Sequence, residues 1–165
     1  MEAGSQCELT NCLLQENSIG LSCSSKSQVK LVNTRVFRNR THGLFSDEKG
    51  TFIELQNCQI KNNGSNAQPG HGVWIASKAK ARIDGSTIES NATNGLLLET
   101  GASLELSNSL IKSNRRCGIL GRMPNTYARL IKSKFINNGS PASPAPGIRA
   151  VQSAKITLDD CEILG

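Results

Sequence analysis

The chain has 165 residues, a formal net charge of +6 and an aromatic content of only 4%. This length suits a single domain, and so few aromatic residues would leave the core of a roughly spherical protein thin. The dispersed charges give no specific nucleic-acid signal, and no apolar run approaches the roughly 18 residues of a membrane span, so we expect no membrane insertion.

One sequence pattern recurs along the whole chain at a period of roughly 22 to 29 residues. In the copy at residues 80–98, apolar residues alternate, a small polar pair follows, and Ile88, Asn91 and Gly95 precede a short apolar run. A regular period with apolar alternation inside each copy indicates a β-solenoid. The Asn recurs at Asn17, Asn39, Asn63, Asn91, Asn114 and Asn138. The Gly recurs at Gly20, Gly43, Gly72, Gly95, Gly118 and Gly147.

Each copy, or rung, contains three short apolar segments, which we expect to form strands with one buried face. The first segments place inward Cys7, Val29, Ile53, Ala81, Leu104, Ala128 and Ile156. The second segments place inward Leu14, Val36, Ile60, Ile88, Ile111, Phe135 and Ile163. The third segments place inward Leu21, Leu44, Val73, Leu96, Ile119 and Ile148.

Strands that pair with their equivalents in the next rung build a parallel β-helix, and the chirality of parallel connections predicts right-handed winding. The sequence therefore predicts an all-β, right-handed, single-stranded parallel β-helix with three short strands per rung and about seven rungs, the last incomplete. Residues 1–5 form an N-terminal segment before the repeats, and residues 6–165 form the β-helix domain. We expect this domain to be a fragment of a larger protein, because the rungs start and stop without a capping helix.

Polar residues mark the two corners that follow the first and second strands. At the first corner Asn11, Asn33, Asn57 and Asn108 recur, and Asn tolerates the left-handed backbone of a tight turn. At the second corner the recurring Asn predicts a ladder of stacked amides that satisfies buried turn groups. Four ladder residues also lie in glycosylation sequons, which we interpret as accidental because a glycan would not fit there.

The six cysteines have no aligned partners. Cys12 and Cys58, for example, are two rungs and so roughly 10 Å apart, whereas a disulfide needs Cα atoms within about 7 Å. No Cys-x-x-Cys pair indicates a zinc site. We therefore expect free thiols, a reducing environment and an intracellular, cytoplasmic protein.

The repeat of alternating apolar residues, Asn with Ser or Cys, a second Asn and then Gly resembles that of the pectin-lyase-like superfamily of right-handed parallel β-helices. The resemblance covers almost the entire chain. It implies the fold but no particular activity, because the superfamily contains polysaccharide lyases, polygalacturonases and non-enzymatic modules. Segments 71–75 and 95–98 look most like the β-helix modules of F-box substrate receptors and SHC-binding spindle proteins.

An enzyme of this superfamily needs acidic residues that converge on one site. Gly70-His71-Gly72 is similar to a polygalacturonase signature, but Asp159 and Asp160 follow it by nearly four rungs, whereas an inverting glycosidase needs carboxyls about 6.5–9.5 Å apart. A lyase would need clustered acids for Ca²⁺. The outward residues of the first strands alternate in charge instead, as Glu8, Lys30, Glu54, Arg82, Glu105 and Arg129. We therefore predict no enzyme activity, no catalytic residues, no cofactor and no metal site.

The strongest candidate for a binding surface lies on the third strands. Outward positions on four adjacent rungs carry large apolar residues, and an exposed row of this kind usually marks an interface. Insertions at residues 64–71 and 139–146 lengthen the corner that precedes these strands, as binding loops often do. The predicted protein-binding residues are Phe45, Trp74, Leu97 and Leu120, with His71, Arg115 and Arg116 at the same corner.

These features favour a non-catalytic protein-interaction scaffold, whose partner is another protein or the remainder of the parent chain. Open strand edges at the ends would also allow end-to-end self-association. The alternative is a degenerate or incomplete carbohydrate-active β-helix of the polygalacturonase or lyase type.

Overall fold

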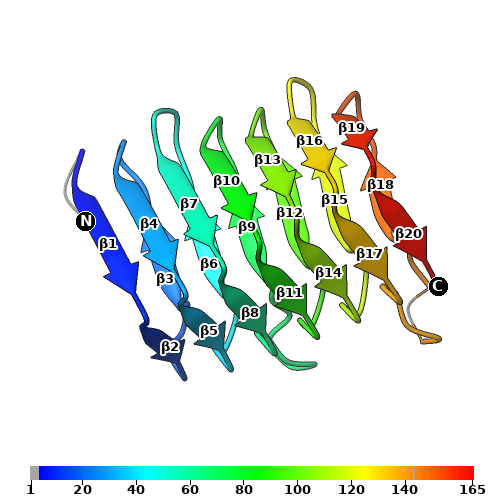
Figure 1. Cartoon of the computed structure of the whole chain (residues 1–165), viewed down its shortest axis with the longest axis horizontal. Helices are drawn as coiled ribbons and strands as arrows, with labels where there is room; N and C mark the ends of the chain where they lie inside the picture. Colours follow the sequence, from blue (N-terminus) through cyan, green and yellow to red (C-terminus); the bar gives the residue numbers. More distant parts are fainter. Residues whose placement is uncertain (1–3, 143) are drawn as a thin grey trace.

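The computed structural model describes residues 4–142 and 144–165, and the 20 strands in this part of the chain form three parallel sheets (Figure 1). Each rung contributes a strand to sheets A, B and C in turn, and the seventh rung adds strands to sheets A and B only. The predicted all-β solenoid of about seven rungs, with three strands per rung, is confirmed. Residues 1–3 of the predicted N-terminal segment 1–5 lie outside the described residues. No helix in the described part could span a membrane.

The strands of each sheet follow one another at intervals of one rung. Sheet A contains β1 (Gln6–Thr10), β4 (Gln28–Val32), β7 (Phe52–Gln56), β10 (Lys80–Asp84), β13 (Ser103–Ser107), β16 (Tyr127–Ile131) and β19 (Lys155–Asp159). Sheet B contains β2 (Leu13–Gln15), β5 (Arg35–Phe37), β8 (Gln59–Lys61), β11 (Thr87–Glu89), β14 (Leu110–Lys112), β17 (Lys134–Ile136) and β20 (Glu162–Leu164). Sheet C contains β3 (Leu21–Cys23), β6 (Leu44–Ser46), β9 (Val73–Ile75), β12 (Leu96–Glu99), β15 (Ile119–Arg122) and β18 (Ile148–Ala150).

The core is a column of stacked aliphatic side chains. In sheet A, Ala81 pairs with Ile53, and in sheet B, Ile88 pairs with Ile60, as the apolar alternation predicts. These four side chains are at most 4% exposed. A column of this kind lets a chain with few aromatic residues bury a continuous core.

The corner between sheets A and B contains a left-handed residue in each rung. Asn11, Asn33 and Asn57 have φ angles of 55°, 50° and 52°, as the recurring Asn predicts. Lys132 and Asp160, which replace Asn in two later rungs, keep the same conformation at 47° and 53°. A second set of left-handed residues, which the sequence analysis did not predict, directly precedes the ladder Asn. This set comprises Glu16, Arg38, Asn62, Ser90, Ser113 and Asn137.

The predicted Asn ladder occupies the corner between sheets B and C. Asn91 Nδ2 donates to Asn114 Oδ1 at 2.9 Å and to the Ile60 carbonyl at 3.3 Å. Asn91 Oδ1 accepts from both the backbone N–H and the Nδ2 of Asn63, at 3.0 Å each. Because Asn91 is only 1% exposed, these bonds satisfy groups that water does not reach.

The glycine that follows the ladder is required by the close approach of neighbouring rungs. At Gly72 a Cβ would lie 2.6 Å from the Gly95 carbonyl oxygen and 2.8 Å from Asn91 Nδ2. Both distances are too short for any side chain. The Gly column and the Asn ladder are therefore two parts of one tight corner.

Replacing Asn91 by Ala removes one amide from the middle of the ladder and leaves backbone and side-chain groups of two neighbouring rungs unpaired. We expect the free energy of unfolding to fall by about 1–3 kcal/mol. Chemical denaturation of the variant beside Asn66→Ala, an Asn to Ala change at an exposed loop position, measures the difference. Equal losses of stability in the two variants would contradict the role given to the ladder.

Candidate protein-binding face

The outward face of sheet C carries the predicted apolar row. Phe45 pairs with Trp74, Trp74 with Leu97, and Leu97 with Leu120, so the four residues lie on four adjacent strands. The rings of Phe45 and Trp74 are 4.7 Å apart. Phe45, Trp74 and Leu120 are partly exposed. The register predicted for this row is therefore present.

The expectation that Leu97 is exposed is wrong, because its side chain is only 3% exposed. Trp74 belongs to the preceding rung, and its indole Nε1 donates to Glu99 Oε1 at 3.1 Å. Glu99 lies two residues after Leu97 on β12, so the indole reaches across the strand that carries Leu97. Leu97 thus supports the face from beneath, between Trp74 and Leu120.

Glu99 is the residue on this face that the sequence analysis missed. Its carboxylate accepts from the Trp74 indole and also forms an ion pair with Arg122 on the next strand. The side chain of Glu99 is only 12% exposed, whereas that of Arg122 is 43% exposed, so the carboxylate is the buried partner of both contacts. The signal was available, because Glu99 and Arg122 continue the outward alternation of Leu97 and Leu120 by one step. This pair of contacts holds the indole in place.

His71 lies beside this row, where it forms part of a second polar stack. The His71 backbone N–H donates to His42 Nδ1 at 3.0 Å, and the Asn94 N–H donates to His71 Nδ1 at 3.4 Å. One rung further on, the Cys117 N–H donates to Asn94 Oδ1 at 3.1 Å. The two imidazoles are stacked with ring centres 5.3 Å apart, and the Trp74 ring packs edge-on against both. His71 therefore supports the aromatic cluster.

Burial and neighbouring positive charges keep the His71 ring neutral. Desolvation is the main cause, followed by the charges of His42, Arg122 and Arg116, and together they lower the pKa of His71 from 6.5 to about 3. Thr93 Oγ1 lies 2.7 Å from Nδ1 and further fixes the ring. Burial also lowers the pKa of His42.

Arg115 and Arg116 are exposed in the corner that leads into β15. Their backbone N–H groups donate to the carbonyls of Asn91 and Thr93 at 3.1 Å and 2.9 Å. The Arg115 guanidinium contacts the side-chain oxygen of Asn66 in the first insertion. A cleft of about 290 Å³ lies here, and residues of both insertions line it. The structure thus brings the two arginines and the two insertions together.

The groups that resemble polygalacturonase signatures are kept apart. His71 lies in the corner between sheets B and C of the third rung, whereas Asp159 ends β19 and Asp160 lies in the following corner of the seventh rung. Four rungs correspond to roughly 19 Å along the axis. These residues do not form one site in this chain.

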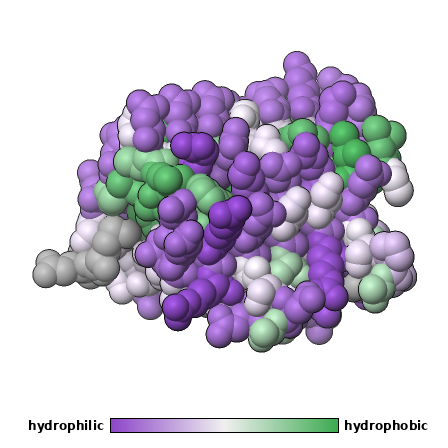
Figure 2. Space-filling view, turned by 90° about the horizontal axis from the view of Figure 1, so that it is seen from below, coloured by the Kyte–Doolittle hydropathy of each residue, from purple (hydrophilic) through white to green (hydrophobic). Residues whose placement is uncertain are grey.

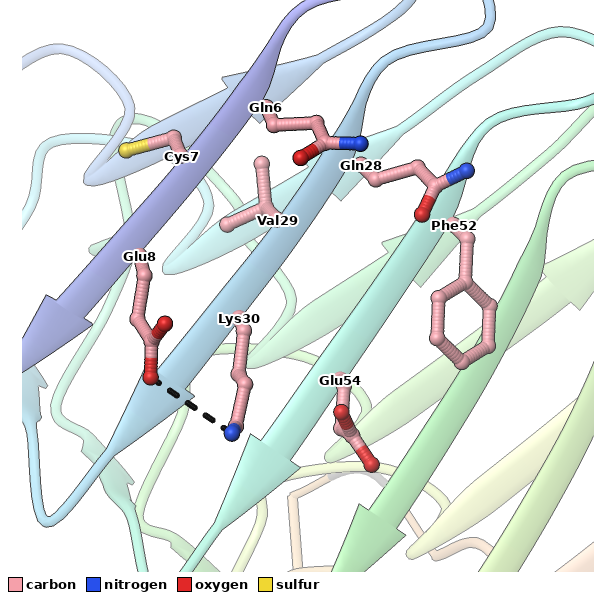
Figure 3. Close-up of a pocket in the computed structure, with 8 residues that line it drawn as sticks. All are labelled: Gln6, Cys7, Glu8, Gln28, Val29, Lys30, Phe52 and Glu54. Atoms are coloured by element: carbon pink, nitrogen blue, oxygen red, sulfur yellow. Dashed lines mark ion pairs between the residues drawn. The ribbon is translucent and has the colours of Figure 1, made fainter.

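The outward face of sheet A carries the predicted alternation of charge. Figure 3 shows Glu8, Lys30 and Glu54 side by side on β1, β4 and β7, around a hollow of about 300 Å³. Lys30 Nζ lies 3.5 Å from Glu8, and further along the sheet Arg82 lies 3.3 Å from Glu105. Among the described residues no cluster of three or more His, Cys, Asp or Glu side chains could hold a metal ion.

All six cysteines are unpaired, as their spacing predicts. Cys23, Cys58 and Cys117 are buried, and desolvation raises the pKa of each thiol. Cys58 also lies at the corner between sheets A and B, where its backbone N–H donates to Ser86 Oγ at 3.0 Å. These cysteines are structural members of the solenoid.

Three parallel sheets wound rung upon rung, with an Asn ladder and a Gly column at one corner, define a parallel β-helix protein. The family described as a right-handed beta helix region matches residues 53–165, and the chain belongs to this family. The predicted right-handed, pectin-lyase-like fold is thereby confirmed.

The crystal structure of pectate lyase Pel9A is similar to this chain, with a TM-score of 0.57 and 13% sequence identity. The similarity covers 97% of this chain and 49% of that one, so the chain spans about half the length of the lyase. At this identity the likeness shows the fold alone. Comparison with curated proteins gives no match.

Replacing His71 by Asn should make the free energy of unfolding fall less as the pH is lowered. Because the pKa of His71 is about 3 when folded and 6.5 when unfolded, the unfolded chain takes up the additional proton between these values. The contribution of the neutral His71 ring to the free energy of unfolding is complete above pH 6.5, and it is lost as the pH falls towards 3. Asn suits this position, since Asn94 holds the equivalent place one rung later.

The measurement is the free energy of unfolding of both proteins at pH 7.5 and at pH 5. We expect a smaller difference between the two pH values for His71→Asn than for the unaltered chain. An identical acid dependence in the two proteins would contradict the neutral, buried state of His71.

Proposed function

We propose that the chain is a non-catalytic protein-interaction scaffold that binds a protein partner through the outward face of sheet C. The observation that carries this proposal is the state of Trp74, which is partly exposed yet held by Glu99, by Phe45 and by the two stacked histidines. Aromatic side chains that are fixed before binding make efficient interface anchors, because little conformational freedom is lost. The partner is a second protein or the remainder of the parent chain.

The titratable groups on this face are held in structural contacts, and this supports the same proposal. His71 is neutral and bonded into a stack that continues through backbone groups, and Glu99 is committed to Trp74 and Arg122. His71 is therefore not poised for proton transfer, which requires a pKa near the working pH. We also infer an intracellular location, on the basis of the six unpaired thiols.

The solenoid ends suggest a further mode of association. The inward side chains Leu158 and Ile163 of the last rung are 45% and 51% exposed. The face that Figure 2 shows is mainly hydrophilic, with hydrophobic patches towards both ends. End-to-end contact between two copies remains part of the proposal.

The alternative is a degenerate or incomplete carbohydrate-active β-helix. The fold shared with pectate lyase Pel9A supports this alternative. Two observations weaken this alternative. Asp159 and Asp160 do not converge with His71 on one site, and the acidic side chains of sheet A alternate with basic ones. We expect no turnover of pectate or polygalacturonate, with or without Ca²⁺, as measured by the release of unsaturated or reducing ends. Turnover that disappears in His71→Ala would promote this alternative over the scaffold.

A double change, Trp74→Ala with Leu120→Ser, should abolish partner binding while preserving the fold. Loss of a central aromatic anchor costs about 2 kcal/mol or more, so the Kd for the partner should rise at least about 30-fold. The Kd is measured by titration calorimetry with the partner purified from the source cells, and circular dichroism checks the fold.

The matched control is Tyr127→Ala, an aromatic truncation on the outward face of sheet A at a residue that is 38% exposed. This control should leave the Kd unchanged. Undiminished binding by the double variant would show that the face of sheet C is not the site. Leu97 is unsuitable for this test, because its burial would mix a loss of stability with a loss of binding.

A further inference from the structure

The corner between sheets B and C forms a notch whose shape follows from the lengths of four successive connections. The connections after β8 and β17 contain the long insertions, and the two rungs between them turn with short corners at residues 90–95 and 113–118. In Figure 1 the two long loops project from the lower side of the molecule. The loops are three rungs, or about 14 Å, apart. We call the space between them the loop notch.

The loop notch has a volume of about 290 Å³, and its lining comes from different rungs. The residues that line it are Ser65, Asn66, Pro69, Ala92, Thr93, Arg115, Arg116 and Ala142. Ala92, Thr93, Arg115 and Arg116 of the short corners line the loop notch between the two loops, and their backbone N–H groups donate to the rung before them at 2.9–3.1 Å. This part of the lining is therefore as rigid as the solenoid itself.

The loop notch is positively charged, and no acidic side chain of the described residues forms an ion pair with its arginines. Neither Arg115 nor Arg116 takes part in the ion pairs found among the described residues. The Arg115 guanidinium contacts only a neutral acceptor there, the side-chain oxygen of Asn66. A charged oxygen would form a stronger, charge-assisted hydrogen bond than this amide oxygen does. Asn66 thus occupies the position that a ligand carboxylate would take.

We propose that the loop notch binds an acidic side chain from an extended segment of the protein partner, through the guanidinium groups of Arg115 and Arg116. This proposal rests on the proposed function, since it assigns chemistry to the segment that reaches the same edge of sheet C. Arg clusters are the usual means of recognising acidic motifs, and a planar guanidinium can hold both oxygens of a carboxylate.

The dimensions and surroundings of the loop notch suit an extended peptide. Because the loops themselves occupy part of the roughly 14 Å between their centres, the loop notch has room for one extended backbone, about 4.8 Å wide, or for one side chain, but not for a planar membrane surface. Arg116 also lies close enough to His71 to act on its ring, and His71 packs against Trp74. A partner segment can therefore place an acidic residue in the loop notch and an apolar residue on Trp74.

The test is a titration of the ¹⁵N-labelled chain with a short capped peptide that contains Glu, observed through backbone amides and arginine Nε–H signals. We expect saturable shifts centred on Thr93, Arg115 and Arg116, and no such shifts with the same peptide carrying Gln. A phosphoserine version of the peptide forms a separate arm. Binding of the phosphoserine peptide alone would overturn the carboxylate assignment.

Two pairs of variants separate specific recognition from general attraction between charges. Arg115→Gln with Arg116→Gln should weaken binding of the Glu peptide at least about tenfold, whereas Arg38→Gln with Arg40→Gln, which removes the same charge from the equivalent corner of the second rung, should not. Asn66→Asp should weaken binding of the Glu peptide, because its carboxylate would compete with the peptide for Arg115. Gln68→Glu adds the same charge to the same loop but does not line the loop notch, and should leave binding unchanged.

Equal effects within either pair would overturn the proposal, because net charge alone would then explain the binding. The proposed function fails separately from this inference. If Trp74→Ala with Leu120→Ser abolishes partner binding while the arginine variant retains it, the scaffold stands and the loop notch is not its site. If the Glu peptide binds as described but the Trp74 variant keeps its partner, the loop notch stands and the face of sheet C is not the interface.

Discussion

The stacking of side-chain amides at the corner between sheets B and C is the interaction on which the rest of the structure depends. The four inner ladder residues each donate to the next amide and to a carbonyl of the preceding rung, and each accepts from the Asn before it; these residues are Asn39, Asn63, Asn91 and Asn114. The chain can turn tightly there only because these buried groups are satisfied from within. The stack repeats at the same spacing as the paired strands, and it keeps equivalent residues of neighbouring rungs aligned at this corner.

The candidate binding face follows from that alignment. Sheet C begins directly after the tight corner, so its outward side chains form straight rows, and Trp74 lies beside Glu99 and the two histidines by position alone. The long insertions lie in the connections around the ladder, where loops can lengthen without disturbing the strands, whereas the connections between sheets C and A range only from three to five residues. A rigid apolar face with adaptable loops along one edge is an arrangement well suited to protein recognition.

Periodicity alone predicted the fold, the inward residues and the members of the apolar row, because a solenoid repeats one backbone geometry in every rung. It could not predict that Leu97 is covered, since this depends on the direction that the Trp74 indole takes towards Glu99. It also missed the left-handed residues Glu16 and Arg38, whose types do not favour that conformation; the stacked corner imposes it. The contact between Arg115 and Asn66 joins two loops of different rungs, and no repeat pattern encodes it.

The dependence of each ladder Asn on its immediate neighbours has a consequence for how the molecule opens. A chain that is held together only between adjacent rungs loses structure from its ends, and each lost rung exposes the edge of the next. The rungs that carry Trp74, Arg115 and Arg116 are the third to the fifth of seven. Each of these rungs is paired with a neighbour on both sides, so the surface proposed to meet the partner opens only after an adjacent rung has been lost.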